Sequence, residues 1–417
     1  MNSLNKIPVY GNKMVERIRK TKSGIKQLFI PGMLFEEMGI IYLGPVDGSD
    51  MKGILRLLKE ASNIEGPVMV HVLTHKGAGY LPAERHPARF HGTEPFDIET
   101  GLPSKPRVKA NYTDIFSTVM RKLGDRDEKV VAITAAMTDG TGLKRFHNMF
   151  PGRFFDVGIA EEHAVTFAAG LAAAGLKPIF AVYSSFLQRA YDQILHDVCI
   201  QNLPVVFAID RAGLVGSDGE THQGIFDISY LSTIPNMTIM APKNKWELSD
   251  MIKYAVDFPT PIAVRYPRGE AYDGLKEYRQ PISVGKSEWI YRESEIALVA
   301  LGSMVKTAEK VHAALREEGI PASLINSRFA KPLDTQMLME AASKHTLVVT
   351  MEENVINGGF GEHITRFYNE QGIYVNVLNI AIPDEYVEHG NVDILYHEVG
   401  IDADTILKRI KEVYHPL

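Results

Sequence analysis

The fold of this chain is decided by the stretch Phe155-Asp-Val-Gly-Ile-Ala-Glu-Glu-His-Ala-Val-Thr-Phe-Ala-Ala-Gly-Leu171. Its second half predicts a helix over about 162–174 that is apolar on nearly every face, which indicates a buried position. Glu161 stands where this helix begins. A carboxylate there either offsets the positive end of the helix dipole or serves as a buried catalytic acid. The spacing alone favours the first interpretation.

Strands and helices alternate on both sides of this stretch. The sequence predicts strands at 130–134, 178–183, 204–210, 237–240 and 262–265, and further helices at 186–201 and 245–256. This alternation is typical of an α/β fold with a doubly wound parallel sheet, whose ligands bind at the carboxyl ends of the strands. Two polar motifs, Tyr183-Ser-Ser-Phe186 and Asp210-Arg-Ala-Gly213, directly follow predicted strands, as that rule requires.

The flanking regions predict further strand–helix–strand units. The C-terminal part has predicted strands at 296–301, 321–325 and 346–350, which indicate a second parallel α/β domain. The N-terminal part has a basic amphipathic stretch at Lys13–Lys26, a strand at 40–43, a turn at Gly44–Gly48, a helix, and a strand at 68–72. One crossover unit of this kind is only part of a parallel sheet.

These patterns predict four parts along the chain. They are the remnant of a domain at 1–75, a linker rich in glycine and proline at 76–110, a domain at 111–275 and a C-terminal domain at 284–417.

Composition narrows the class of protein. With 417 residues, of which 45% are hydrophobic and 23% charged, the chain is ordinary for a globular protein of two or three domains. The net charge of -6 and the lack of a basic run argue against nucleic acid and membrane surfaces as partners. Nothing approaches the ~18 apolar residues of a membrane span, so we expect a cytoplasmic protein. The single cysteine, Cys199, excludes an internal disulfide and a cysteine-built metal site.

Five motifs occur in a fixed order. They are the opening stretch, Tyr183-Ser-Ser-Phe-Leu-Gln-Arg-Ala-Tyr-Asp-Gln193, Asp210-Arg-Ala-Gly213, Gly216-Ser-Asp-Gly-Glu-Thr-His222 and Arg265-Tyr-Pro-Arg-Gly269. On these residues the chain closely resembles the 1-deoxy-D-xylulose-5-phosphate synthases, which are transketolase-like enzymes that use thiamine diphosphate. The resemblance runs from about Leu4 to the C-terminus. It implies part of a diphosphate-binding domain, a pyrimidine-binding domain and a C-terminal α/β domain.

The resemblance assigns cofactor contacts to three residues. Glu161 matches the acid that bonds to a ring nitrogen of the aminopyrimidine and promotes its reactive tautomer. Phe186 matches the aromatic residue that stacks on this ring, although a phenylalanine after a strand is usually a core residue. Met137 is a further candidate for lining the pocket, and ordinary core packing explains it equally well.

The resemblance also assigns substrate contacts. Arg211 and Arg268 match the positions that bind the phosphate of glyceraldehyde 3-phosphate, for which a guanidinium is well suited because its planar fork pairs two oxygens at once. Tyr183 matches a hydroxyl donor, and Asp218 and His222 match polar contacts to substrate. His222 is also a candidate for catalytic proton transfer near neutral pH. Without the resemblance, the arginines would be taken for surface ion-pair residues and Asp218 for a turn residue.

The sequence departs from the family pattern in its N-terminal part. The Gly-Asp-Gly motif and the following Asn that hold magnesium and diphosphate in the family do not occur, so no metal ligand is assigned. Ser49 stands where the family usually has His, and Ala78 stands where it tends to have a second basic residue. The resemblance therefore implies thiamine diphosphate and Mg²⁺ as cofactors, while the isolated chain is expected to be inactive or to need a separate N-terminal partner chain.

The implied reaction condenses pyruvate with glyceraldehyde 3-phosphate and releases CO₂, which makes this a transketolase-type transferase. Its product is a precursor of isoprenoids, thiamine and pyridoxal, and the expected assembly is a homodimer. Two alternatives stay open. One is a non-catalytic subunit that binds a sugar phosphate or acts as a scaffold. The other is half of a two-chain transketolase or 2-oxo-acid dehydrogenase, although Arg211-Ala-Gly together with Gly216-Ser-Asp-Gly-Glu-Thr-His222 favours the synthase.

Overall fold

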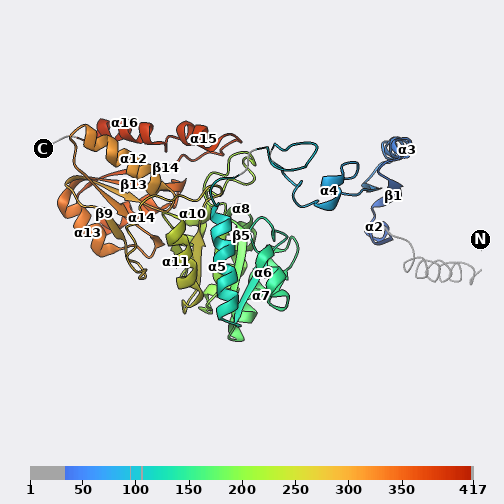
Figure 1. Cartoon of the computed structure of the whole chain (residues 1–417), viewed down its shortest axis with the longest axis horizontal. Coiled ribbons are helices and arrows are strands. Elements are labelled where there is room, and N and C mark those ends of the chain that lie inside the picture. Colours follow the sequence, from blue (N-terminus) through green and yellow to red (C-terminus); the bar gives the residue numbers. More distant parts are fainter. Residues whose placement is uncertain (1–32, 94, 105–106, 415–417) are drawn as a thin grey trace, which may run out of the picture. The chain divides into compact units, whose positions relative to one another are not determined.

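The structure is a computed structural model that describes residues 33–93, 95–104 and 107–414. It divides into two compact units, Met1–Pro106 and Arg107–Leu417 (Figure 1). The amphipathic helix predicted at Lys13–Lys26 lies outside the described residues. No helix in the described ranges is long and apolar enough to cross a membrane.

The first unit is built around two parallel strands. Its elements are α2 (Met33–Glu37), β1 (Ile41–Asp47), α3 (Met51–Ala61), β2 (Val68–Leu73) and α4 (Leu81–Arg85). The predicted crossover unit is confirmed, because β1 pairs with β2 in parallel. The turn predicted at Gly44–Gly48 is wrong: its first four residues belong to β1, where an irregularity between Leu43 and Val46 takes up the glycine and proline. The predicted linker at 76–110 contains α4.

The second unit contains a seven-stranded sheet with the order β12-β7-β8-β6-β5-β3-β4. Its strands are β3 (Val130–Thr134), β4 (Phe154–Asp156), β5 (Lys177–Tyr183), β6 (Val206–Asp210), β7 (Thr238–Met240), β8 (Ile262–Arg265) and β12 (Phe329–Lys331). The predicted parallel pairing is confirmed for the five strands that the sequence predicted, β3 and β5 to β8. The sequence did not predict β4, which also pairs in parallel with β3. The seventh, β12, comes from the C-terminal part of the chain and runs antiparallel at the edge beside β7.

Helices cover both faces of this sheet, as a doubly wound fold requires (Figure 1). One face packs on α5 (Tyr112–Arg126), α6 (Lys144–Met149) and α11 (Lys245–Val256). The opposite face packs on α7 (Glu161–Ala173), α10 (Asp227–Ser232) and the helical segment at 184–199. Alternate strand residues therefore face opposite layers: in β3, Ala132 joins the first layer and Ile133 the second.

The segment predicted as a helix at 186–201 is helical at 184–199, but the helix is irregular. The segment consists of α8 (Ser184–Leu187), a 3₁₀ turn η3 (Gln188–Ala190), α9 (Tyr191–Gln193) and a π-helical turn η4 (Ile194–Cys199). Four of its fully buried apolar residues are three apart at the start and four apart afterwards: Leu187, Ala190, Ile194 and Val198. The tight turn followed by the wide turn keeps these residues on one buried side, and such irregular turns often occur near functional sites.

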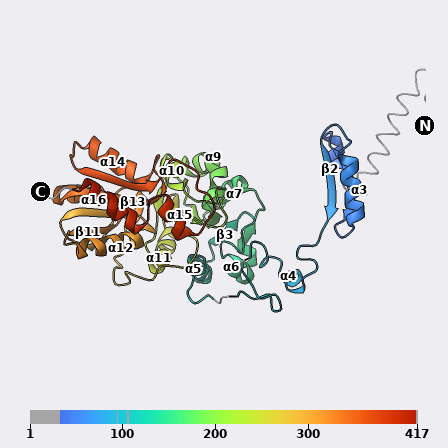
Figure 2. The ribbon, with the colours of Figure 1, turned by 90° about the horizontal axis from the view of Figure 1, so that it is seen from above.

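A five-stranded sheet with the order β14-β13-β10-β11-β9 forms the C-terminal part. Its strands are β9 (Glu288–Tyr291), β10 (Glu295–Ala300), β11 (Ala322–Asn326), β13 (His345–Val355) and β14 (Asn376–Ile382). The predicted parallel pairing is confirmed for β10, β11 and β13. Two strands were not predicted: β14 pairs in parallel with β13, and β9 is an antiparallel edge strand. The sheet lies between α12 (Met304–Glu317), α15 (Val392–Glu398) and α16 (Ala403–Val413) on one face and α13 (Thr335–Lys344) and α14 (Phe360–Glu370) on the other (Figure 2).

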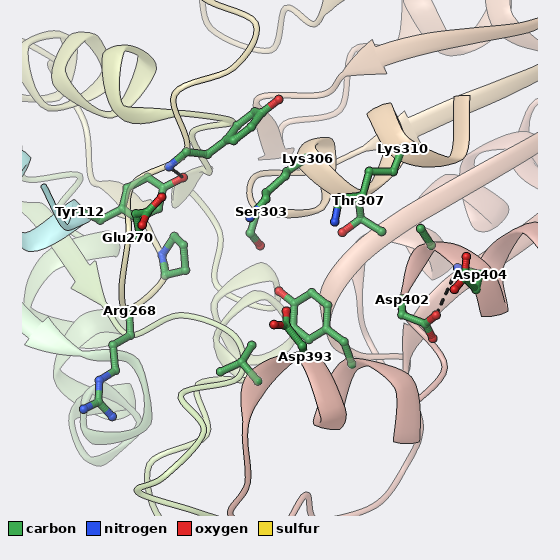
Figure 3. Close-up of a pocket in the computed structure, with 15 residues that line it drawn as sticks. Tyr112, Arg268, Glu270, Ser303, Lys306, Thr307, Lys310, Asp393, Asp402 and Asp404 are labelled. Atoms are coloured by element: carbon green, nitrogen blue, oxygen red, sulfur yellow. Dashed lines mark hydrogen bonds between the residues drawn. The ribbon is translucent and has the colours of Figure 1, made fainter. Parts of the chain in front are cut away.

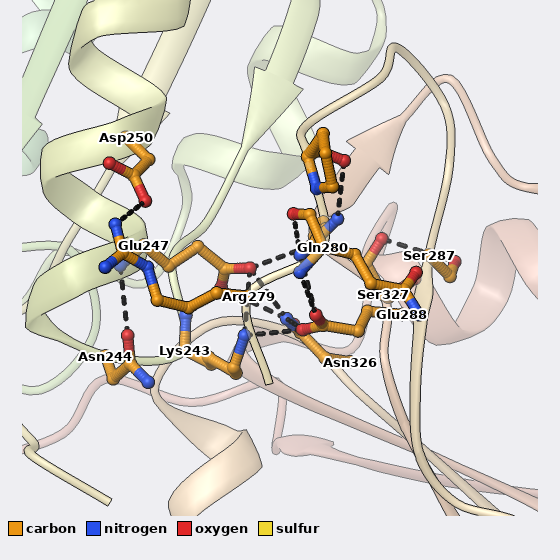
Figure 4. A network of polar contacts seen from close by, with 12 residues as sticks. Lys243, Asn244, Glu247, Asp250, Arg279, Gln280, Ser287, Glu288, Asn326 and Ser327 are labelled. Carbon is orange, nitrogen blue, oxygen red and sulfur yellow. Dashed lines mark hydrogen bonds and ion pairs between the residues drawn. The ribbon is translucent and has the colours of Figure 1, made fainter. Parts of the chain in front are cut away.

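A buried ionic network joins the two sheets of the second unit (Figure 4). Lys243 lies 3.2 Å from Glu247 and 2.5 Å from Glu288, and it is 1% exposed. The Nε of Arg328 donates to Glu247 at 2.8 Å, and its Nη2 lies 3.0 Å from Glu288. Asn326 donates to Glu247 as well. The two cations thus pair with two carboxylates, so that burial leaves no single charge uncompensated.

Candidate active site

Glu161 is the first residue of α7 and is 1% exposed. Its Oε1 accepts a hydrogen bond from Nη1 of Arg189 at 2.8 Å. Its Oε2 is buried and has no hydrogen-bond partner. A buried carboxylate oxygen without a partner is unfavourable, so Oε2 is the carboxylate oxygen of Glu161 that is available to a ligand.

An aromatic cluster lies next to this acid. The Arg189 guanidinium lies over the ring of Phe186, 4.9 Å from its centroid. Phe186 is also 5.5 Å from the ring of Tyr183 and 5.2 Å from the ring of His222, centroid to centroid. The structure therefore brings three of the predicted site residues into one cluster and connects them to Glu161 through Arg189.

Arg211 is held firmly beside the same cluster. Its guanidinium lies 3.6 Å from the centroid of the Tyr183 ring, and its Nη1 donates to the carbonyl of Gly140 at 3.1 Å. Burial raises the pKa of the Tyr183 hydroxyl, which Arg211 partly offsets, so the tyrosine remains a donor. Residue 140 must be glycine for its backbone to lie this close to Tyr183, because a Cβ there would be 1.7 Å from the Tyr183 oxygen.

Asp210 fixes the backbone of Arg211. Its Oδ1 accepts from the backbone N–H of Arg211 at 2.7 Å, and its Oδ2 accepts from the Thr113 hydroxyl at 2.8 Å. Arg211 has a φ of 59°, in the left-handed region that non-glycine residues rarely adopt. Asp210 is fully buried, and this burial raises its pKa to about 6 despite the nearby Arg211.

Arg268 and Asp218, which belong to the last two of the five sequence motifs, form an ion pair. Nη1 of Arg268 donates to Oδ2 of Asp218 at 2.7 Å and to the carbonyl of Val215 at 3.3 Å. Their side chains are 32% and 36% exposed. An exposed pair of this kind contributes little to stability, so Arg268 can exchange its carboxylate for another anion at small cost.

A cleft of about 490 Å³ separates the two sheet domains of the second unit next to Arg268 (Figure 3). Lys306 and Lys310 line one wall, and Asp393 lies across from them. Of the predicted site residues only Arg268 lines this cleft, and its side chain points away from the two lysines. Asp218 instead lines a separate hollow of about 420 Å³ with His389.

Met137 is placed differently from the other predicted residues. It is 7% exposed and belongs to the hydrophobic core on which Tyr183 and Phe186 also pack. Its carbonyl accepts hydrogen bonds from the backbone and hydroxyl of Thr141. Its contribution to a ligand pocket therefore stays a prediction.

Sequence reasoning missed Arg189, Asp210 and Gly140. Arg189 lies three residues after Phe186 in a quoted motif, and this helical spacing was a usable signal for a shared face. Asp210 is a charged residue at the end of an apolar strand, which is a further usable signal. Gly140 offered no comparable signal, because its role depends on the distant Tyr183.

These residues fit the pyrimidine part of thiamine diphosphate. The orphaned Oε2 of Glu161 offers a partner for a ring nitrogen, and Phe186 offers an aromatic face. No group of three or more His, Cys, Asp or Glu that could hold a metal ion occurs among the described residues. Ser49, at a position where the family usually has His, is hydrogen-bonded to Asp47 through both its N–H and its hydroxyl.

Comparison with known protein families agrees with this geometry. Residues 1–74 match the family 1-deoxy-D-xylulose-5-phosphate synthase. Residues 108–273 match the pyrimidine-binding domain of transketolase, and residues 285–406 match the transketolase C-terminal domain.

Two solved structures share the fold. One, described as a split gene transketolase in an inactive beta4 tetramer, has a TM-score of 0.66 and 26% identity, covering 73% of this chain and 98% of its own. The other, transketolase from Campylobacter jejuni, has a TM-score of 0.61 and 16% identity, covering 93% of this chain and 70% of its own, and supports the fold alone.

Curated relatives are considerably more similar. The 1-deoxy-D-xylulose-5-phosphate synthase of Lachnoclostridium phytofermentans is 55% identical over 98% of this chain and 65% of its own length. The synthase of Caldanaerobacter subterraneus subsp. tengcongensis is 50% identical over 99% of this chain and 67% of its own length. The chain thus spans about two thirds of the length of these relatives, and it belongs to the 1-deoxy-D-xylulose-5-phosphate synthase family.

Proposed function

We propose that this chain provides the pyrimidine-binding and acceptor-binding side of a 1-deoxy-D-xylulose-5-phosphate synthase. The reaction would join pyruvate to glyceraldehyde 3-phosphate with loss of CO₂. The observation that carries the proposal is Glu161, a buried acid with one oxygen held by Arg189 and the other without a partner. Named relatives of up to 55% identity support the same reaction.

On this proposal, Glu161 and Phe186 act on the cofactor. Thiamine diphosphate supplies, when bound, the carbon nucleophile that the side chains of a protein lack. Glu161 would hold a proton between its Oε2 and a pyrimidine nitrogen, and Phe186 would provide the flat apolar surface for that ring. Burial of Glu161 limits the access of water to this proton transfer.

The acceptor side has a separate set of residues. Arg211 is held by Gly140 and Tyr183, so its guanidinium is already positioned before a phosphate arrives. Arg268 would release Asp218 and bind the same phosphate. His222, in contact with Phe186, would move a proton at the substrate.

We also propose that a complementing N-terminal segment supplies the diphosphate and magnesium ligands. Two findings support this. The chain matches about two thirds of the length of its relatives, and one structure with the same fold is described as a split gene transketolase in an inactive beta4 tetramer. A homodimer, a cytoplasmic location and the domain division at 1–75, 76–110, 111–275 and 284–417 stay predictions. The non-catalytic alternative predicts binding of sugar phosphate without turnover in any combination of chains.

The test separates the cofactor side from the acceptor side. The chain is combined with the N-terminal segment of a relative, and two quantities are measured: proton exchange at C2 of the cofactor and KM for glyceraldehyde 3-phosphate. Glu161→Gln should abolish exchange, because the acid acts before either substrate reacts. Arg268→Ala should leave exchange intact and raise the acceptor KM about tenfold or more, because a charge-assisted phosphate contact is lost. Unchanged exchange in Glu161→Gln would remove this residue from its proposed role.

A further inference from the structure

We propose that Arg189 is a positioning residue for Glu161. It holds Oε1 of the carboxylate so that Oε2 remains directed at the ring nitrogen of a bound aminopyrimidine. The inference rests on the proposed function, because it takes the pyrimidine of that cofactor as the ligand.

The two oxygens of Glu161 have different surroundings. Oε1 lies 2.8 Å from Nη1 of Arg189, whereas Oε2 is buried without any partner. The Glu161 side chain is 2% exposed, so neither oxygen can turn into solvent. No side-chain capping bond forms at the start of α7, where Ala160 is the N-cap residue. With its first oxygen held by Arg189, the carboxylate keeps its second oxygen available to a donor on a ligand.

Arg189 is itself held in place for this task. It belongs to the 3₁₀ turn η3, and the following residue, Ala190, is fully buried. Its guanidinium packs on the face of Phe186, 4.9 Å from the ring centroid. This contact restricts the conformations of the Arg189 side chain. The arginine thus ties the acid that bonds the pyrimidine to the aromatic ring that supports it, although these two residues come from different elements of the fold.

One alternative uses the same contacts. Because the Arg189 side chain is 46% exposed and covers Phe186, it could act as a plug that the pyrimidine must displace. The two ideas predict opposite signs. Removing a positioning residue weakens pyrimidine binding, whereas removing a plug strengthens it. The unpartnered Oε2 favours positioning. A plug that covered Phe186 and also took the place of the pyrimidine at Glu161 would bond both oxygens of the carboxylate.

The experiment measures binding of two small probes to the full chain by ligand-observed NMR titration. The first probe is 4-amino-5-hydroxymethyl-2-methylpyrimidine, and the second is its analogue with the ring nitrogen facing Glu161 replaced by CH. Neither probe contains diphosphate, so no metal is needed. The variants are Arg189→Met, Arg189→Lys, Glu161→Gln and the double variant Arg189→Met/Glu161→Gln. The exposed neighbour Gln188→Met in the same turn is the matched control.

We expect Arg189→Met to weaken the pyrimidine about tenfold, the effect of one lost charge-assisted hydrogen bond, and the CH analogue less than about twofold. Arg189→Lys should restore part of the loss, and Arg189→Met should add nothing in the Glu161→Gln background, since both changes remove one function. Gln188→Met should bind both probes like the parent chain.

Three outcomes would overturn the inference. Equal weakening of both probes would show that Arg189 only packs on the ring, and tighter binding of either probe would show a plug. Additive effects of the two substitutions would show that Arg189 does not act through Glu161. In each of these cases the proposed function survives, because the pyrimidine still binds the parent chain. If the parent chain binds neither probe, the inference and the proposed cofactor site fail together.

Discussion

Asp210→Asn should remove a pH dependence of stability that comes from one buried carboxyl group. The pKa of Asp210 is raised from 3.8 to about 6, mainly by its burial. Between these values the folded chain keeps a proton that the unfolded chain releases, so the contribution of Asp210 to stability is full below pH 3.8 and falls as the pH rises through about 6. A shift of this size, at about 1.4 kcal/mol per pH unit, amounts to about 3 kcal/mol.

Asparagine is a suitable replacement at this position. Its amide oxygen can accept from the backbone N–H of Arg211, and its amide nitrogen can donate to the Thr113 hydroxyl, which is able to accept as well as donate. The variant therefore keeps both contacts and loses only the titration.

The assay is urea unfolding followed by tryptophan fluorescence between pH 4 and pH 7.5. Both tryptophans, Trp246 and Trp289, lie in the second unit with Asp210, so the signal reports on the relevant part. Relative to Asp210→Asn, the parent chain should lose about 2.4 kcal/mol of unfolding free energy over this range, because the rest of the full effect falls below pH 4. Asp218→Asn, a change at a half-exposed carboxylate, is the control. If parent and Asp210→Asn change in parallel with pH, Asp210 does not keep its proton in the folded state and the reasoning fails.

Two further predictions follow from packing. Arg328→Met should lower the unfolding free energy by about 3–5 kcal/mol, because Glu247 and Glu288 would then share only Lys243 inside the protein; the exposed pair Lys253–Asp250 provides the control, and Lys253→Met should cost less than about 1 kcal/mol. Equal losses of unfolding free energy in Arg328→Met and Lys253→Met would show that breaking the buried network costs no more than breaking an exposed pair. Hydrogen exchange should be faster in β1 and β2 than in β5 and β6, because the two-stranded sheet has partly exposed strands whereas the other two strands lie inside a seven-stranded sheet. Comparable protection in both places, with no partner chain present, would show that the first unit is stable by itself.

The sequence by itself determined the class of fold and most of its elements. Apolar runs such as 130–134 and the apolar spacing in 245–256 report local burial, and both regions form the predicted strand and helix. The order of the motifs also indicated the family, because each motif is a short run of residues that is readable without knowing its partners.

Only the tertiary structure decided which distant residues meet. Arg189 reaches Glu161 across 28 positions, and β12 leaves its own domain to pair with β7. The irregular turns at 184–199 likewise depend on the core against which their apolar residues pack. Periodicity records which side of a segment is buried, but the identity of the neighbour depends on how whole elements pack, and that packing places an arginine on one oxygen of Glu161 and leaves the other without a partner.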